Sequence, residues 1–253
     1  MEPFATSSHR PANQLLSCLS DEHFGFVGRH LELVTLKVRE RLETPTARLK
    51  YAYFIEAGIA SVVLISGTAR RPAEVGLIGR EGMTGIGLLH DADRATCEIS
   101  MHLEGAALRI EAAAIREAIE RSISLRSLLL RYAYLFSLQI AHTAAANAQG
   151  SIVERLARWL LMAHDRVDGD ALQFTQEFLS TVLSVRRAGV TGAMELLQSR
   201  GCVATGRGSI TVVDREALHA CAGGLYGVPE AHFADFFGVV RQRREEDVRR
   251  EKS

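Results

Sequence analysis

The chain has 253 residues, of which 30 are basic and 30 acidic, so its formal net charge is zero. Hydrophobic residues make up 47% and charged residues 24%, which is ordinary for a folded globular protein of one or two domains. The balanced charge argues against a protein that coats nucleic acid nonspecifically, but it permits one whose basic residues are clustered.

The four cysteines are scattered and contain no C-x-x-C pair. We therefore expect no disulfide framework and a reducing, cytoplasmic location. The first residues lack the apolar core of a signal peptide, and no apolar run is long enough to span a bilayer. Residues 1–12 are polar with two prolines, which predicts a loose arm.

Two short helices are predicted next, over 13–19 and 21–30, followed by a strand over 31–38. From there to residue 110 the pattern is β throughout. We expect strands that end or turn at glycines: 53–58 and 59–66, then 74–78, and a pair, 97–103 and 106–110, around Glu104-Gly105. Short strands at this spacing favour a barrel or a sandwich.

A helix is predicted over 111–121, and a longer one runs from Leu125 to about Ala148. The longer helix is apolar on more than one face, so it must be covered on more than one side. Two interpretations remain open. The helix is buried within one monomer, or it is covered by its own sheet and by the matching helix of a second copy.

Gln149-Gly150-Ser151 is the expected hinge, and Ser151 with Glu154 forms a capping box that starts the next helix. After a turn at 168–170, residues 172–197 predict two short helices joined by a tight turn. Thr175 suits the N-cap of the first. The buried face of the second helix is expected to consist of Val190, Ala193, Met194 and Leu197.

The outer face of this second helix carries Arg186, Arg187, Ala188, Thr191 and Gly192. Two arginines, a hydroxyl and small residues near a helix N-terminus suit the major groove of DNA. An ordinary helical hairpin with a solvated arginine face is the alternative.

A strand, a glycine-rich turn and a second strand follow over 202–214 and predict a β-hairpin, or wing. Its tip carries Arg207. We expect Thr175, Gln176 and Arg207 to contact the phosphate backbone, and Arg186 and Arg187 to contact guanine edges or nearby phosphates.

These segments resemble one known family. V-E-R-L-A-R-W-L-L-M at 153–162, T-Q-E-F-L at 175–179, V-R-R at 185–187 and the wing are similar to the Crp/Fnr family of bacterial transcriptional regulators. The resemblance covers roughly residues 13–222. It implies an α+β protein, in which an N-terminal β-roll like that of cyclic-nucleotide-binding domains precedes a long dimerisation helix and a winged helix-turn-helix.

We therefore predict a sensor domain over 1–121, a dimerisation helix over 122–148, a DNA-binding domain over 149–222 and a C-terminal extension over 223–253. The resemblance further implies a homodimer that binds a palindromic duplex site. RNA polymerase and an unidentified small-molecule effector are its further candidate partners. The extension lies outside the resemblance, and its mixed charges indicate a solvated helix or a frayed tail.

The expected effector pocket involves Gly85, Ile86, Arg94 and Ala95. Cyclic-nucleotide binders of the family carry a glutamate where this chain has Ile86, and an arginine that Arg94 matches by position. Arg94 is otherwise a surface residue. Without the glutamate a ribose hydroxyl would stay unpaired, at a cost of roughly 1–3 kcal/mol, so we do not expect cyclic AMP to be the effector.

Other differences from the family concern the DNA site and the cofactors. The family often has a glutamate beside the arginine and a second arginine one turn later, where this chain has Ala188 and Gly192. Only Cys18 lies in the N-terminal region that ligates an iron–sulfur centre in the oxygen-sensing branch, so we expect no such cluster. No metal or haem ligand set is evident either.

The glycine-rich stretch at 79–87 lacks the lysine of a phosphate-binding loop, and the chain has neither H-E-x-x-H nor G-x-S-x-G. We therefore do not expect an enzyme. A sensor or protein-interaction module that does not read DNA remains the alternative to a transcriptional regulator.

Overall fold

The computed structural model describes residues 10–66 and 71–251. The chain forms two compact units. Of the described residues, the first unit contains 10–60, 78–137 and 230–251, and the second contains 61–66, 71–77 and 138–229. The fold is α+β, as the sequence predicts. The predicted domain limits at residues 121, 148 and 222 stay predictions.

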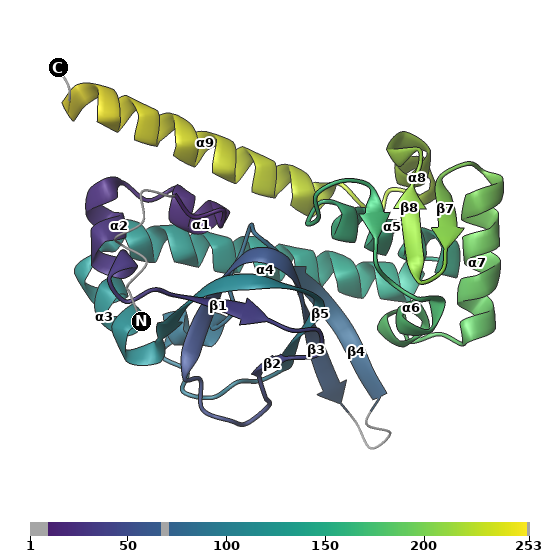
Figure 1. Cartoon of the computed structure of the whole chain (residues 1–253), viewed down its shortest axis with the longest axis horizontal. Helices are drawn as coiled ribbons and strands as arrows, with labels where there is room; N and C mark the ends of the chain where they lie inside the picture. The colour runs from purple at the N-terminus through teal and green to yellow at the C-terminus, as the bar shows by residue number, and fades with distance from the viewer. Residues whose placement is uncertain (1–9, 67–70, 252–253) are drawn as a thin grey trace. The chain divides into compact units, whose positions relative to one another are not determined.

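The first unit is built around an antiparallel sheet (Figure 1). Its strand order is β1-β5-β3-β4, with β2 paired to β5. The strands are β1 (Glu32–Leu36), β2 (Arg41–Glu43), β3 (Tyr51–Ser66), β4 (Arg71–Ile78) and β5 (Glu98–Glu111). Two short helices, α1 (Gln14–Ser17) and α2 (Asp21–Gly28), precede the sheet at the predicted places. Residues 1–9, most of the predicted arm, lie outside the described residues.

The glycines at 58 and 105 are not turns, which corrects the prediction of separate short strands. β3 and β5 each run without interruption through their glycine. Gly58 has φ +88°, and a Cβ atom there would lie 2.6 Å from the carbonyl oxygen of Leu103. A Cβ atom on Gly105 would overlap the carbonyl oxygen of Ala57. The glycines therefore let two backbones approach closely within one pair of long strands.

Buried hydrogen bonds join the helices of this unit to its sheet. Asn13 is fully buried and donates from Nδ2 to the carbonyls of Ile55 (2.9 Å) and Gly82 (2.8 Å). The Tyr132 hydroxyl donates to the carbonyl of Met83 at 3.0 Å. Because buried polar groups are costly when unpaired, these bonds specify where α1 and the long helix attach.

Three helices complete the first unit: α3 (Ala112–Arg121), the first part of α4 (Ile123–Gln149) and most of α9 (Val228–Glu251). The C-terminal extension is therefore a helix, one of the two predicted forms, but it is not simply solvated. Phe233, Phe236 and Phe237 are buried, and the Phe233 ring lies 6.4 Å from that of Tyr132 on α4. The Arg131 guanidinium lies 5.7 Å from the ring of Phe236. Aromatic contacts thus attach α9 to α4.

The second unit contains the end of α4, the helices α5 (Ile152–His164), α6 (Gln176–Val182), α7 (Arg187–Ser199) and α8 (Arg215–Cys221), and a small antiparallel sheet. That sheet has the order β6-β8-β7, from β6 (Ala171–Leu172), β7 (Val203–Gly206) and β8 (Ser209–Val212). The predicted capping box is present, because Ser151 accepts from Glu154 N–H while the Glu154 carboxylate accepts from Ser151 N–H.

Trp159 on α5 is the centre of this unit's core. Its ring lies 5.0 Å from that of Phe174 and 5.8 Å from that of Phe178. Its indole N–H donates to the buried carboxylate of Glu74 on β4, which also accepts from the Ser61 hydroxyl. The far end of the β3–β4 hairpin is therefore part of the same core as α5. In the described part of the chain, every helix is too short or too polar to cross a bilayer.

Candidate nucleic-acid interface

The predicted helix-turn-helix is formed by α6 and α7. Thr175 is the N-cap of α6 and its hydroxyl accepts from Phe178 N–H at 3.1 Å. The turn places Ser184 at φ +52°, a left-handed conformation that is uncommon for residues other than glycine. Val190, Ala193, Met194 and Leu197 are buried, which confirms the predicted inner face of α7.

The outer face at the start of α7 presents two arginines to solvent. Arg186 is the N-cap residue and Arg187 the first residue of the helix, and both are exposed, as are Ala188 and Gly192. Among the described residues, neither guanidinium has a hydrogen-bond or ion-pair partner. Two unpaired cations beside the free N–H groups of a helix N-terminus form a surface that suits an anionic ligand such as the DNA backbone.

Thr191 and Gln176 bind each other, which the sequence does not predict. The Thr191 hydroxyl is 3.0 Å from Oε1 of Gln176 and 3.2 Å from the carbonyl oxygen of Arg187. This bond joins α7 to the start of α6 and fixes both side chains at the outer surface of the motif. The two residues are fifteen positions apart, so no local pattern in the sequence could indicate the contact.

The predicted wing is the hairpin of β7 and β8. Gly206 and Ser209 are directly opposite each other, which leaves a two-residue turn of Arg207 and Gly208. Gly208 has φ +77°, the conformation that such a tight turn requires. Arg207 is exposed at the tip. The sequence missed β6, a third strand of only two residues that pairs with β8.

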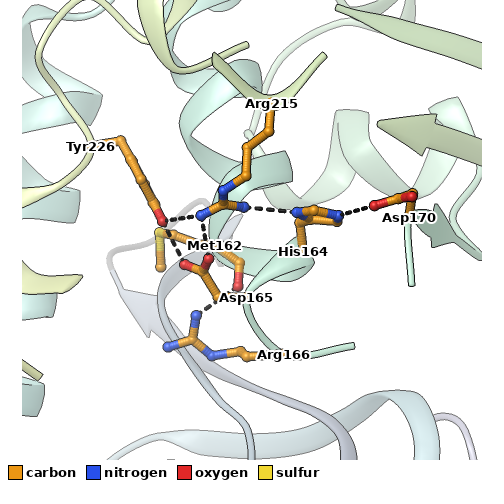
Figure 2. Close-up of polar contacts among 7 residues, drawn as sticks. All are labelled: Met162, His164, Asp165, Arg166, Asp170, Arg215 and Tyr226. Carbon is orange, nitrogen blue, oxygen red and sulfur yellow. Dashed lines mark hydrogen bonds and ion pairs between the residues drawn. The ribbon is translucent and has the colours of Figure 1, made fainter. Parts of the chain in front are cut away.

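A polar network holds the elements that support the motif (Figure 2). Arg215, the first residue of α8, donates to Asp165 (2.5 Å), to the Tyr226 hydroxyl (2.7 Å) and to Nδ1 of His164 (2.7 Å). Tyr226 in turn donates to Asp165 at 2.7 Å. Because Nδ1 of His164 accepts from Arg215, its Nε2–H donates to Asp170 at 2.9 Å. The network thus joins the end of α5, the turn before β6 and the start of α8.

Among the residues predicted for the effector pocket, Gly85 contacts a carboxylate that the sequence did not single out. Gly85, with φ +77°, begins a 3-10 helix, η2 (Ile86–His90). Its N–H donates to Oε1 of Glu43 at 2.6 Å. Glu43 is buried, and burial raises the pKa of its carboxyl group despite the hydrogen bonds from Gly85 and Thr84. Glu43 lies 42 positions before Gly85, so only the fold brings them together.

The other residues predicted for that pocket differ in how far they are exposed to solvent. Arg94 is exposed and donates from Nη1 to the carbonyl of Thr46 at 2.6 Å. Ala95 is buried and Ile86 is half-buried. Across the described residues, no three histidine, cysteine or acidic side chains gather as metal ligands would.

Comparison with known proteins identifies the domain that contains the helix-turn-helix and the wing. Residues 154–221 match the family described as the Crp-like helix-turn-helix domain. No curated protein sequence matches the chain.

Solved structures of Crp/Fnr-type regulators have the same fold at low identity. FixK2 from Bradyrhizobium japonicum is 13% identical with a TM-score of 0.65, over 76% of this chain and 96% of its own. A Crp-family regulator from Thermus thermophilus is 18% identical with a TM-score of 0.63, over 76% and 97%. The c-di-GMP-responsive regulator CLP from Xanthomonas campestris is 15% identical with a TM-score of 0.60, over 77% and 100%.

The matched segment includes α6, α7 and the wing, the elements that carry the exposed arginines. The resemblance predicted from the sequence is therefore confirmed. Residues 154–221 therefore form a Crp-like helix-turn-helix domain, and the fold of the chain is that of solved Crp/Fnr-type structures.

Proposed function

We propose that the protein is a transcriptional regulator that recognises a specific, palindromic duplex site as a homodimer. The observation that carries the proposal is the exposed pair Arg186 and Arg187 at the start of α7, with Arg207 exposed on the wing of the same domain. Arginine is the side chain that most often reads guanine in the major groove, and an arginine at a wing tip suits phosphate.

The homodimer is supported by the surface of α4. Ile123 and Tyr134 on this helix are 85% and 66% exposed. Tyr134 lines an open groove together with Leu130 of α4 and with Phe236 and Val239 of α9. Exposed apolar side chains beside such a groove are typical of an interface with a second copy. A two-fold pair of recognition helices would then meet half-sites about 34 Å apart on DNA.

Cyclic AMP is not the effector in this proposal. The buried Glu43 carboxylate already accepts from Gly85 N–H, and a cyclic phosphate brought to that position would face a carboxylate rather than a donor. Arg94 donates to the backbone of Thr46. We propose a different small-molecule effector and, for a regulator of this type, contact with RNA polymerase. Isothermal titration calorimetry with cyclic AMP tests whether this nucleotide is the effector. Binding with a micromolar dissociation constant would contradict the proposal.

Selection from random duplex DNA tests the function itself. We expect enrichment of a palindrome, and Arg187→Ala should relax preference at one base position of each half-site. A bidentate arginine–guanine contact contributes about 1–3 kcal/mol of discrimination, so preference there should fall by roughly 5- to 150-fold.

Arg207→Ala should instead weaken binding to all sequences alike and reduce the salt dependence by about one unit of slope. Arg29→Ala, which removes an exposed arginine from the first unit, is the matched control and should change neither quantity. If Arg187→Ala leaves every base preference intact, Arg187 does not read DNA.

The quaternary structure is tested separately by analytical ultracentrifugation. Tyr134→Asp should convert the dimer to a monomer, because it would bury an unpaired charge in the interface. Leu33→Asp on β1, where the leucine is 58% exposed, is the matched control and should leave the dimer intact. A wild-type protein that sediments as a monomer at micromolar concentration would refute the dimer.

A module that does not read DNA is the second candidate. Ala188 and Gly192 favour it, because these exposed positions carry no group that can hydrogen-bond a base edge. The random-DNA selection separates the two functions, since this candidate predicts that no sequence is enriched.

A further inference from the structure

Two cysteines face each other inside the helix-turn-helix domain. The Sγ atoms of Cys202 and Cys221 lie 3.6 Å apart, although the residues are 19 positions apart in the chain. Cys202 is fully buried just after α7, and Cys221 is the last residue of α8. A disulfide requires an S–S distance of about 2.0 Å, so the sulfurs would need to move closer by roughly 1.6 Å.

We propose that Cys202 and Cys221 are an oxidisable pair that closes into an intramolecular disulfide when the protein meets hydrogen peroxide. The proposal concerns a modification site and does not depend on which DNA sequence the protein binds. It rests on the placement of the two sulfurs and of one neighbouring cation.

That cation is Arg200, whose Nη1 lies 3.4 Å from the sulfur of Cys221. Cys221 is 9% exposed and Cys202 is fully buried, so Cys221 is the sulfur that a peroxide reaches first. Cys202 has the opposite character. Burial, together with its hydrogen bond to Cys221, raises the pKa of its thiol to about 11, so it keeps its proton at neutral pH.

The reaction then proceeds in two balanced steps. The Cys221 sulfur gives up its proton and attacks one oxygen of hydrogen peroxide, the O–O bond breaks, and the other oxygen takes up a proton and leaves as water, which leaves a sulfenic acid on Cys221. The Cys202 sulfur attacks the Cys221 sulfur, the S–O bond breaks, and the leaving hydroxide takes the thiol proton of Cys202 to form a second water. Two thiols together lose two electrons, and one molecule of hydrogen peroxide is reduced to two waters.

The disulfide would fix the base of the wing. The carbonyl of Cys202 accepts from the N–H groups of Val213 (2.9 Å) and Asp214 (3.2 Å), and its own N–H donates to the carbonyl of Leu197 at 3.0 Å. Cys202 therefore joins the end of α7 to the two residues between β8 and α8. A bond to Cys221 would attach this junction covalently to α8 and restrict its opening.

Intact mass and peptide mapping after treatment of the full-length protein with hydrogen peroxide test the pair. We expect a loss of about 2 Da, one linked peptide pair containing Cys202 and Cys221, and recovery of the original mass with a thiol reductant. Titration of the unfolded protein should then detect two of its four thiols, those of Cys18 and Cys97. Amide exchange at Val213 and Asp214 should be slower in the oxidised protein.

Single variants provide the controls. Cys221→Ser and Cys202→Ser should each abolish the loss of mass, whereas Cys97→Ser should retain it. Peptide mapping of the wild-type protein gives the result even if a serine variant fails to fold. The proposal is overturned if all four thiols remain titratable after peroxide, if the linked peptides contain other cysteines, or if Cys221 gains about 32 Da as a sulfinic acid without forming the bond.

Discussion

Replacing Arg215 by alanine should destabilise the second unit markedly, because one side chain makes three of the bonds in Figure 2. Hydrogen bonds to a charged group contribute about 1.5–3 kcal/mol each when buried. The side chains of Arg215 and Asp165 are 40% and 27% exposed, so solvent screens part of that energy. Exposed ion pairs contribute about 0–1 kcal/mol. Between these limits, we expect a loss of about 2 kcal/mol for the whole network.

Urea and thermal unfolding, followed by the fluorescence of Trp159, measure this loss. A loss of about 2 kcal/mol should lower the melting temperature by roughly 4–8 °C. Arg215→Lys should recover only part of it, because lysine keeps the charge but lacks the planar fork that reaches three partners.

Arg207→Ala, which removes an exposed wing arginine from the same domain, should change the melting temperature by less than about 1 °C. If Arg215→Ala and Arg207→Ala unfold at the same temperature, the network in Figure 2 contributes nothing to stability and the reasoning is wrong.

Two further changes test the first unit. The pKa of Glu43 is raised in the folded state, so the folded protein retains this proton to a higher pH than the unfolded chain does. The stability that this bound proton contributes is complete below 4.5, the ordinary pKa of a glutamate, and is lost as the pH rises through the pKa of Glu43 in the folded protein. Glutamine cannot ionise, so the melting temperature of Glu43→Gln should rise relative to that of wild type as the pH is raised from 4 to 8. A difference in melting temperature that does not vary with pH would contradict this. Gly105→Ala should cost about 3 kcal/mol or more in urea unfolding, because its Cβ overlaps the Ala57 carbonyl oxygen. Gly25→Ala, with no atom within 4 Å of the added Cβ, is the control and should be neutral or stabilising.

The helix-turn-helix could be predicted from sequence because its evidence is local. The spacing of Val190, Met194 and Leu197 indicates one buried helix face, and Thr175 provides an N-cap within the same short segment. The family match to residues 154–221 includes the same segments. The wing was predictable for the same reason, since its turn needs a glycine at position 208.

What the sequence could not predict depends on contacts between distant residues. A glycine that ends a strand and a glycine that lets two strands approach have the same local pattern, so Gly58 and Gly105 were misassigned as turns. The bonds Glu43–Gly85 and Thr191–Gln176 join separate elements, and no periodicity indicates either. The roles in DNA contact predicted for Thr191 and Gln176 stay predictions, although their side chains are already bonded to each other.

The last helix affects how the molecule can be shortened. A version trimmed at residue 222, where the likeness to the family ends, would lose the rings of Phe233, Phe236 and Phe237. Tyr132 would then lose an aromatic neighbour, and Arg131 its ring partner. Such a truncated protein would expose an apolar surface to water and would tend to precipitate. The residues beyond the wing should therefore be retained whenever the protein is produced.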